Sequence, residues 1–171
     1  FFRKLFKGKY NLARFLLVAV NLAILLDFVF LLVSGLSFSK FVMGWVDLRA
    51  LRPDYPEYFR FMRFGHVCAC FWAVVLMGIH LGQHAQQMFG MLKVNKLPKC
   101  LSFLFTVATL AVAAYGNYVF VADGWFDQLF DPMPHVFQGL DLTDPELLFD
   151  ASASVIFFAL IGHLLQNAAK R

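Results

Sequence analysis

Charged residues are scarce in this sequence. They make up 15% of its 171 residues, whereas hydrophobic residues make up 60% and aromatic residues 18%. A soluble domain of this size could not bury so much apolar surface, so the composition excludes an ordinary soluble protein and predicts a single membrane domain over residues 1–171. Lipid is expected to cover the apolar surface that the chain leaves exposed.

Motifs of soluble catalysis and of covalent cofactor attachment are also missing. The sequence has no Gly-rich phosphate loop, no nucleophile elbow and no CxxCH motif, so any haem is expected to be held non-covalently. The three cysteines give no disulfide framework, because Cys68 and Cys70 point to different sides of a helix. The net charge of +4 indicates orientation in a membrane rather than binding to nucleic acid.

Four apolar runs are long enough to cross a hydrocarbon core of about 30 Å as helices. They cover residues 15–38, 63–88, 100–122 and 148–168. The first run is too long for a signal-peptide core and has no small-residue cleavage site, so we expect it to be a first span. The sequence therefore predicts an all-α fold, an integral membrane four-helix bundle.

The basic residues predict the orientation of this bundle. Lys and Arg gather in the N-terminal segment, in the loop after the second run and at the C-terminal end, whereas the acidic loop over residues 123–147 has none. By the positive-inside rule, both termini are expected in the cytoplasm and the acidic loop outside. The loop after the first run is the exception. It holds Lys40, Arg49, Arg52, Arg60 and Arg63.

The second run carries three of the five histidines: His66, His80 and His84. His66 and His80 are fourteen residues apart, which places them on one helix face, offset by about 40° and separated by about 21 Å along the axis. A histidine inside a bilayer is costly and usually faces the bundle interior, so two at this separation indicate two stacked sites. Haem suits such sites, because its iron takes imidazole nitrogen and its ring fits between apolar helices.

The fourth run repeats part of this pattern. Residues 66–84 align without gaps with residues 149–167, so that His80 corresponds to His163. Both runs are expected to cross the membrane in the same direction, which places His80, His84 and His163 towards the cytoplasm. We predict His80 and His163 as the ligand pair of an inner haem, with His84 as the competing ligand or as a partner of a propionate or quinone.

The outer site has fewer histidines. His66 lies near the outer end of its run, and the first and third runs offer no histidine to pair with it. His135 or Met133 in the acidic loop is the candidate for the second axial ligand of an outer haem; the alternative is an interfacial His66 without metal. Arg63 and the other arginines of the first loop are expected either to pair with haem propionates or to anchor the chain in the interface.

Two further residues in the apolar runs carry predictions. Asp27 lies near the middle of the first run, where a carboxyl group is expected to be protonated or paired. It either exchanges protons with a quinone or hydrogen-bonds Asn117 or another polar group of the third run. Gly116, in the small-residue middle of the third run, predicts a close approach of two helices.

The second run resembles the corresponding helix of the four-helix membrane b-type cytochromes, which include the flavinylation-associated cytochromes. That helix has a histidine, a second one fourteen residues on and a third four beyond, here His66, His80 and His84 in the ending IHLGQH. The LLVSGLSF ending of the first run is also similar to the family. Ala85 departs from it, standing where an aromatic residue is usual. More loosely, the chain is similar to the b-type subunits of formate dehydrogenases and hydrogenases.

The resemblance implies two haem b groups and electron transfer between membrane quinone and a redox partner protein outside the membrane, one that carries flavin, iron-sulfur or further haem. It also implies an electron-transfer subunit of a larger complex in a prokaryotic-type inner membrane. The residues leave two alternatives open. One is a pigment-binding or structural subunit of a large assembly, and the other is a small transporter or channel with Asp27 and the histidines on a proton path.

Overall fold

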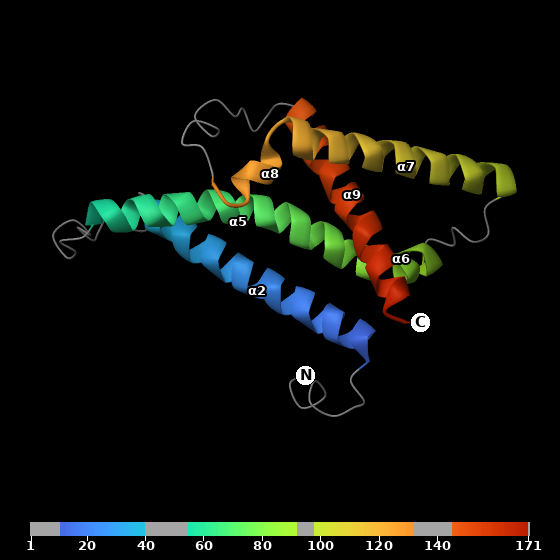
Figure 1. Cartoon of the computed structure of the whole chain (residues 1–171), viewed down its shortest axis with the longest axis horizontal. Coiled ribbons are helices and arrows are strands. Elements are labelled where there is room, and N and C mark those ends of the chain that lie inside the picture. The colour runs from blue at the N-terminus through green and yellow to red at the C-terminus, as the bar shows by residue number, and fades with distance from the viewer. Residues whose placement is uncertain (1–10, 40–54, 92–97, 132–144, 171) are drawn as a thin grey trace.

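The computed structural model describes residues 11–39, 55–91, 98–131 and 145–170 (Figure 1). Within these ranges the helices are α2 (Leu12–Phe38), α5 (Tyr55–Gln83), α6 (Ala85–Met91), α7 (Lys99–Ala122), α8 (Trp125–Gln128) and α9 (Pro145–Ala168), and no strand occurs there. Four of them, α2, α5, α7 and α9, are long and apolar enough to cross a membrane. The predicted all-α fold with four spanning helices is confirmed, and the chain is a multi-pass membrane protein by the length and composition of these helices.

The first spanning helix, α2, is apolar around its whole circumference. Its N-terminus is capped by Asn11, whose side chain accepts a hydrogen bond from the backbone N–H of Ala13 at 3.4 Å. Of its described side chains only Ala13 and Ser34 are buried, and large residues such as Leu26 and Phe28 are about 60% exposed. A helix that is hydrophobic on all sides needs lipid or another apolar partner on its outward face.

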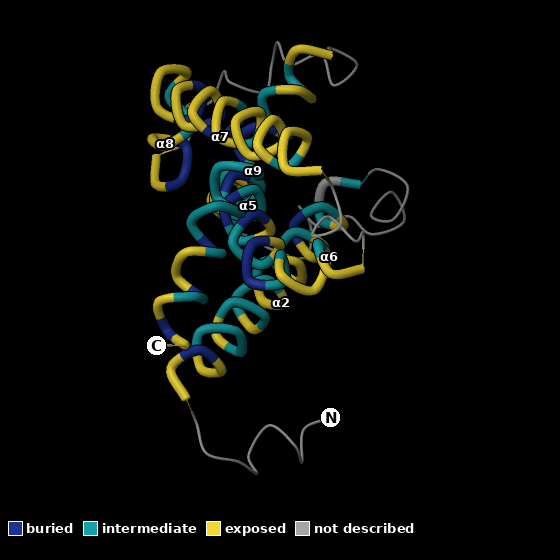
Figure 2. Tube along the Cα trace, turned by 90° about the vertical axis from the view of Figure 1, so that its right-hand side faces the viewer, coloured by how far each residue is buried: buried dark blue, intermediate teal, exposed yellow. Residues whose placement is uncertain are grey.

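The spanning helices pack in the spatial order α2, α5, α9 and α7. The central pair is α5 and α9, with α2 against α5 and α7 against α9 (Figure 1). The helices alternate in direction along the chain, so α5 and α9 run the same way, and the start of α2 and the end of α9 lie towards the same end of the molecule. Figure 2 shows that exposed residues cover most of α7, whereas α5 and α9 are mainly half-buried or buried.

Glycines bring the backbones of α5 and α9 into contact. A Cβ atom on Gly82 would overlap the carbonyl group of Ala159, and one on Gly162 would overlap that of Ile79. One turn earlier, a Cβ on Gly78 would meet α9 in the same way. Small residues at a membrane helix interface allow such close approach and favour van der Waals packing.

Gly116 has the same function between α7 and α9. A Cβ atom there would overlap the carbonyl group of Ala153, and the neighbouring Ser154 donates a hydrogen bond to the Gly116 carbonyl oxygen at 3.3 Å. The predicted close approach at Gly116 is thus confirmed.

The second spanning helix differs from the predicted run over residues 63–88. It begins at Tyr55, because Pro56 fits the first turn of a helix, and it ends at Gln83. At His84 the backbone N–H is shared between the carbonyl oxygens of His80, at 3.3 Å, and Leu81, at 3.2 Å. Such shared bonds tighten a helix end, and α6 follows as a separate helix.

An aromatic cluster joins α8 to α5 and α7. Trp72 of α5 donates its indole N–H to the Leu129 carbonyl oxygen at 3.1 Å, and Phe71 meets Trp125 edge-on with ring centroids 5.5 Å apart. The cluster holds α8, at the start of the acidic loop, against α5 and α7.

Candidate functional site

His66 lies on the side of α5 that faces α2. Its Nδ1 is 2.8 Å from the hydroxyl oxygen of Ser34, which is completely buried. The Ser34 hydroxyl is placed to donate its one proton to the Phe30 carbonyl oxygen at 2.7 Å or to the Leu31 carbonyl oxygen at 3.2 Å, and Nδ1–H of His66 then donates to the hydroxyl oxygen. Metal-binding histidines are commonly held in this way, with one ring N–H bonded to a protein oxygen.

His80 lies on the same side of α5 and lines two apolar hollows. One, of about 430 Å³, is shared with α2 and also lined by Asn21, Ile24, Leu25, Phe28 and Met77. The other, of about 380 Å³, reaches α9 and is also lined by Ala73, Val74, Met77, Leu81 and Val155. Nδ1 of His80 is buried and has no hydrogen-bond partner among the described residues. A buried polar atom left without a partner is costly and rare, so His80 is suited to take a ligand.

His84 lies beside His80 in the turn between α5 and α6. The two ring centroids are 4.8 Å apart with an interplanar angle of 59°, and Nδ1 of His84 lies 3.1 Å from the side-chain oxygen of Gln87. The structure thus places the competing ligand next to the predicted one.

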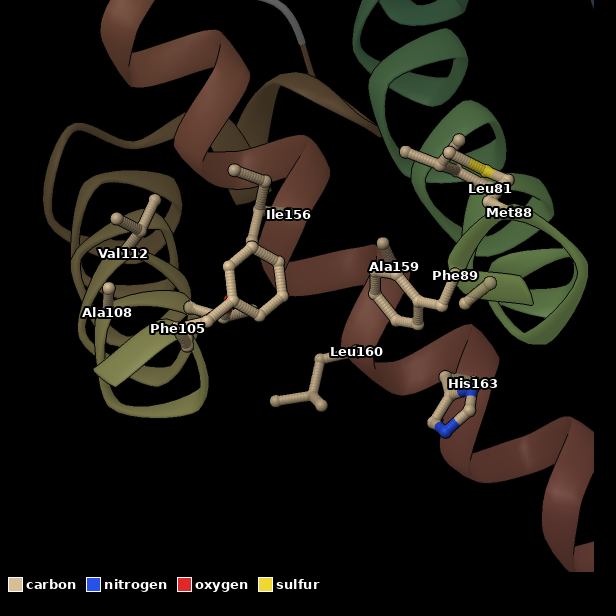
Figure 3. Close-up of a pocket in the computed structure, with 12 residues that line it drawn as sticks. Leu81, Met88, Phe89, Phe105, Ala108, Val112, Ile156, Ala159, Leu160 and His163 are labelled. Carbon is tan, nitrogen blue, oxygen red and sulfur yellow. The ribbon is translucent and has the colours of Figure 1, made fainter. Parts of the chain in front are cut away.

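His163 lies in a different part of the bundle. It lines a cavity of about 400 Å³ between α5, α6, α7 and α9 (Figure 3). The other residues around this cavity are nearly all apolar: Leu81, Ala85, Met88, Phe89, Phe105, Ala108, Thr109, Val112, Ile156, Ala159 and Leu160. Nε2 of His163 is 2.9 Å from the side-chain nitrogen of Asn167.

The predicted pair of His80 and His163 lines separate cavities. Between these cavities, α5 and α9 touch through Gly82 and Gly162. A haem ring held by both imidazoles therefore requires the two helices to separate at this level. The pairing stays a prediction. Its energetic cost is the loss of the close contact between α5 and α9 at this level.

The outer site lies partly outside the described residues. His135 and Met133 belong to residues 132–144, which the structure does not describe. Asp131 is the last described residue before them. Arg63 is exposed on α5, three residues before His66 and on the same side of the helix.

Asp27 is half-buried on α2, the helix that packs against α5. The alternative hydrogen bond to Asn117 is not formed in the described structure. Asn117 is exposed on α7, whereas α2 packs against α5. The prediction paired the first and third runs, but α5 and α9 lie between them.

A chain of hydrogen-bonded side chains behind His163 was not predicted from the sequence. It joins Asn167 to Gln86 of α6 at 3.0 Å, and Gln86 to Lys170 at 3.1 Å. The spacing of four residues between His163 and Asn167 is a usable signal for a contact on one helix. The contact between Gln86 and Asn167 has no such spacing signal, because Gln86 lies on α6, whose position depends on where α5 ends.

Within the four described ranges, no group of three or more His, Cys, Asp or Glu residues is arranged to hold a metal ion. Axial ligation of haem needs only one or two side chains, which is a different arrangement. No protein-family model, curated protein or solved structure matches this chain, so the functional argument rests on the geometry of its own residues.

Proposed function

We propose that the protein is a membrane b-type cytochrome that transfers electrons between a membrane quinone and a redox partner outside the membrane. One observation carries the proposal. His66 and His80 both lie on the α2-facing side of α5, and a buried nitrogen of His80 has no partner among the described residues beside two apolar hollows. Fourteen residues of helix separate the two imidazoles by about 21 Å along the axis.

The residues present fit a non-covalently held haem. The hollows beside His80 are walled mainly by aliphatic and aromatic side chains, and Nδ1 of His66 is hydrogen-bonded to Ser34, a kind of contact that is common for histidines that ligate a metal. Haem bound there would supply one-electron redox chemistry, and the protein would set its potential through the axial ligands and their burial.

The remaining ligand assignments follow the sequence predictions. His163 is the proposed partner of His80 on an inner haem, with His84 as the alternative, and His135 is the proposed partner of His66 on an outer haem. Arg63 is placed on the His66 side of α5 and is suited to a propionate.

Orientation and partners complete the proposal. The basic residues favour an orientation with both termini in the cytoplasm and the acidic loop outside, and the resemblance implies an inner membrane of the prokaryotic type. The unpartnered apolar face of α2 suits lipid or a further subunit of a larger complex. On the outer side, the partner would carry flavin, iron-sulfur or further haem.

The test is a dithionite-reduced minus oxidised absorption spectrum of the purified protein, with haem counted per polypeptide. His66→Ala and His80→Ala are each expected to lose one haem or turn it high-spin. His84→Ala and His163→Ala show which of these residues is the second ligand of His80. Phe64→Ala, an exposed change on the same helix, is the control and keeps both haems. A folded protein without any haem band would contradict the proposal.

A pigment-binding subunit is the second candidate, and one observation favours it. His80 and His163 line separate cavities, which is the arrangement expected where each histidine ligates its own magnesium pigment. Organic-solvent extraction of the purified protein would release such a pigment. In this case His80→Ala and His163→Ala would each lose a different pigment and leave the other in place.

A further inference from the structure

The first half of α7 diverges from the helix against which its second half packs. The buried residues of α7 all lie in the second half, from Ala113 to Phe120, whereas no residue from Lys99 to Val112 is buried. In Figure 1 the start of α7 extends away from α9. The divergence leaves the cavity of about 400 Å³ between α5, α6, α7 and α9 (Figure 3).

The walls of this cavity expose almost no polar atom. Its polar lining residues are Thr109 and His163, and both are engaged elsewhere. The Thr109 hydroxyl donates to the Phe105 carbonyl oxygen at 2.8 Å, and Nε2 of His163 is 2.9 Å from the side-chain nitrogen of Asn167. An ordered water needs two to four polar partners, which these walls do not supply. The occupant of the cavity is therefore expected to be apolar.

A chain of hydrogen bonds holds α6 in place as one wall of the cavity. The ammonium group of Lys170 has only donors, so it donates to the side-chain oxygen of Gln86 at 3.1 Å. The Gln86 amide N–H₂ then donates to the side-chain oxygen of Asn167 at 3.0 Å, which turns the Asn167 amide N–H₂ towards His163. These bonds join α6 to the end of α9.

The cavity is open to the surface of the bundle. Its lining residues Leu81, Met88 and Phe105 are 37%, 37% and 44% exposed. Along α7 the lining runs from Phe105 to Val112, about 10 Å at 1.5 Å per residue, so the opening faces hydrocarbon where α7 spans a membrane. Lining atoms without neighbours lose dispersion contacts, and hydrocarbon that enters from the membrane restores them.

The end of the bundle where α7 begins and α9 ends is positively charged. Lys99 is the first residue of α7, about 9 Å along the helix from Phe105, and Lys170 lies just beyond α9. Both lysines are exposed. The sequence has no Asp or Glu over residues 58–122 or 151–171 to neutralise them. Lysines at the ends of spanning helices attract anionic lipid head groups.

We infer that this cavity binds one acyl chain of an anionic phospholipid, with the head group at the end of the bundle that carries Lys99 and Lys170. The apolar walls take the chain, and the two ammonium groups favour a negatively charged head group over a neutral one. The site goes beyond the proposed function and does not rest on it, because lipid binding needs no haem. The bound lipid would pack against the half of α7 that buries no residue in the protein.

The first experiment compares two lipids that differ only in the head group. Dioleoyl phosphatidylglycerol and dioleoyl phosphatidylcholine are titrated into the delipidated full chain in detergent, and the Kd of the first bound lipid is measured by native mass spectrometry. Phosphatidylglycerol is expected to bind about 10- to 30-fold more tightly, since each lysine contributes about fivefold.

Charge variants test the head-group contribution. The double variant Lys99→Gln with Lys170→Gln is expected to lose the preference for phosphatidylglycerol and to keep the affinity for phosphatidylcholine. The matched control is Arg60→Gln, an exposed change near the start of α5 and so at the opposite end of the bundle, which keeps the preference.

The second experiment fills the cavity. Ala108→Phe places a ring in it and is expected to weaken the binding of both lipids by about 10- to 100-fold, as for overpacking of a filled site. Ala114→Phe is the matched control and keeps both affinities. Ala114 is exposed and, at 100° per residue, lies on the opposite side of α7 from Phe105.

A phosphatidylglycerol with a photoreactive diazirine in one acyl chain locates the bound chain. Cross-links are expected on Met88, Phe89 or Leu160, which line the cavity, and are expected to disappear in Ala108→Phe. Cross-links confined to α2 would overturn the site, because they would place the lipid on the exposed apolar face of that helix.

Equal affinities for the two lipids, or wild-type affinities in Ala108→Phe, would also overturn the site. A dimer of the delipidated chain that covers α7 and binds no lipid would do the same. Haem counted on the same samples separates this proposal from the cytochrome. A protein without haem that binds phosphatidylglycerol as expected would support the lipid site and contradict the cytochrome.

Discussion

The two sides of α5 place histidines in different environments. Towards α2, an apolar hollow lies beside His80, and the buried hydroxyl of Ser34 contacts His66. Towards α9, the backbones touch, and His163 lies beyond the contact with its ring fixed by side-chain amides. The three histidines thus differ in their surroundings: His66 contacts a buried hydroxyl, His80 has a buried nitrogen without a partner among the described residues, and His163 contacts a side-chain amide.

The size of the residues at each interface explains this difference. Large side chains of α2, those of Leu25 and Phe28, line the hollow beside His80, whereas Gly78, Gly82 and Gly162 let α5 and α9 touch. Space for a bound ring therefore lies on the two outer sides of the α5–α9 pair. The distance between helices, as well as the choice of histidine, decides where a cofactor or substrate can bind.

The largest expected effect comes from disrupting the glycine contact between α5 and α9. Gly82→Leu or Gly162→Leu would drive a side chain into the backbone of the opposite helix, and we expect a loss of stability at or above about 3 kcal/mol, the upper end of overpacking costs. The measurement is the yield of monodisperse protein and its thermal unfolding. Gly90→Leu is the control, because nothing lies within 4 Å of a Cβ atom at that position. Equal yields for these variants would mean that α5 and α9 are not in contact.

The α2 side is tested by removing its unpartnered nitrogen. His80→Leu replaces a buried polar group by an apolar one, and in haem-free protein we expect the free energy of unfolding to rise by about 1–3 kcal/mol, the cost of leaving such a group without a partner. In haem-loaded protein the same change is expected to lower stability, because a ligand to the bound group is lost. Thermal unfolding of both forms gives the two signs. Destabilisation of the haem-free form would indicate that His80 has a structural partner.

A smaller effect is expected at the hydroxyl that holds His66. Ser34→Ala removes a hydrogen bond worth about 1 kcal/mol. It also makes the imidazole a weaker electron donor, so the midpoint potential of the outer haem is expected to rise. A redox titration measures this shift. Ser37→Ala is the control, because Ser37 bonds the Val33 carbonyl oxygen and Tyr58 and makes no bond to a histidine. Equal midpoint potentials in both variants would mean that the Ser34 hydroxyl does not affect the outer haem.

The sequence is sufficient to predict the spanning helices of this fold and part of the site. Length and apolar composition predict the four spanning helices, because lipid imposes those requirements on each helix separately. Helical spacing alone places His66 and His80 on one side of α5. The packing partner of each helix could not be predicted, since it depends on which glycines meet. For that reason the sequence offered Asn117 to Asp27, although α5 and α9 lie between their helices.

The smallest expected effect lies at the exposed end of the hydrogen-bond chain. Lys170→Met removes the donor that fixes the direction of the Gln86 amide, so His163 is expected to show a small shift of its nitrogen-15 signals towards a mixture of tautomers. Stability should change by no more than about 0.5 kcal/mol, as for most surface substitutions. Lys99→Met, at the exposed start of α7, is the control. If the His163 signals respond to Asn167→Ala but not to Lys170→Met, then Asn167 alone sets the tautomer, and the difference between the two sides of α5 comes from the amide nearest the ring.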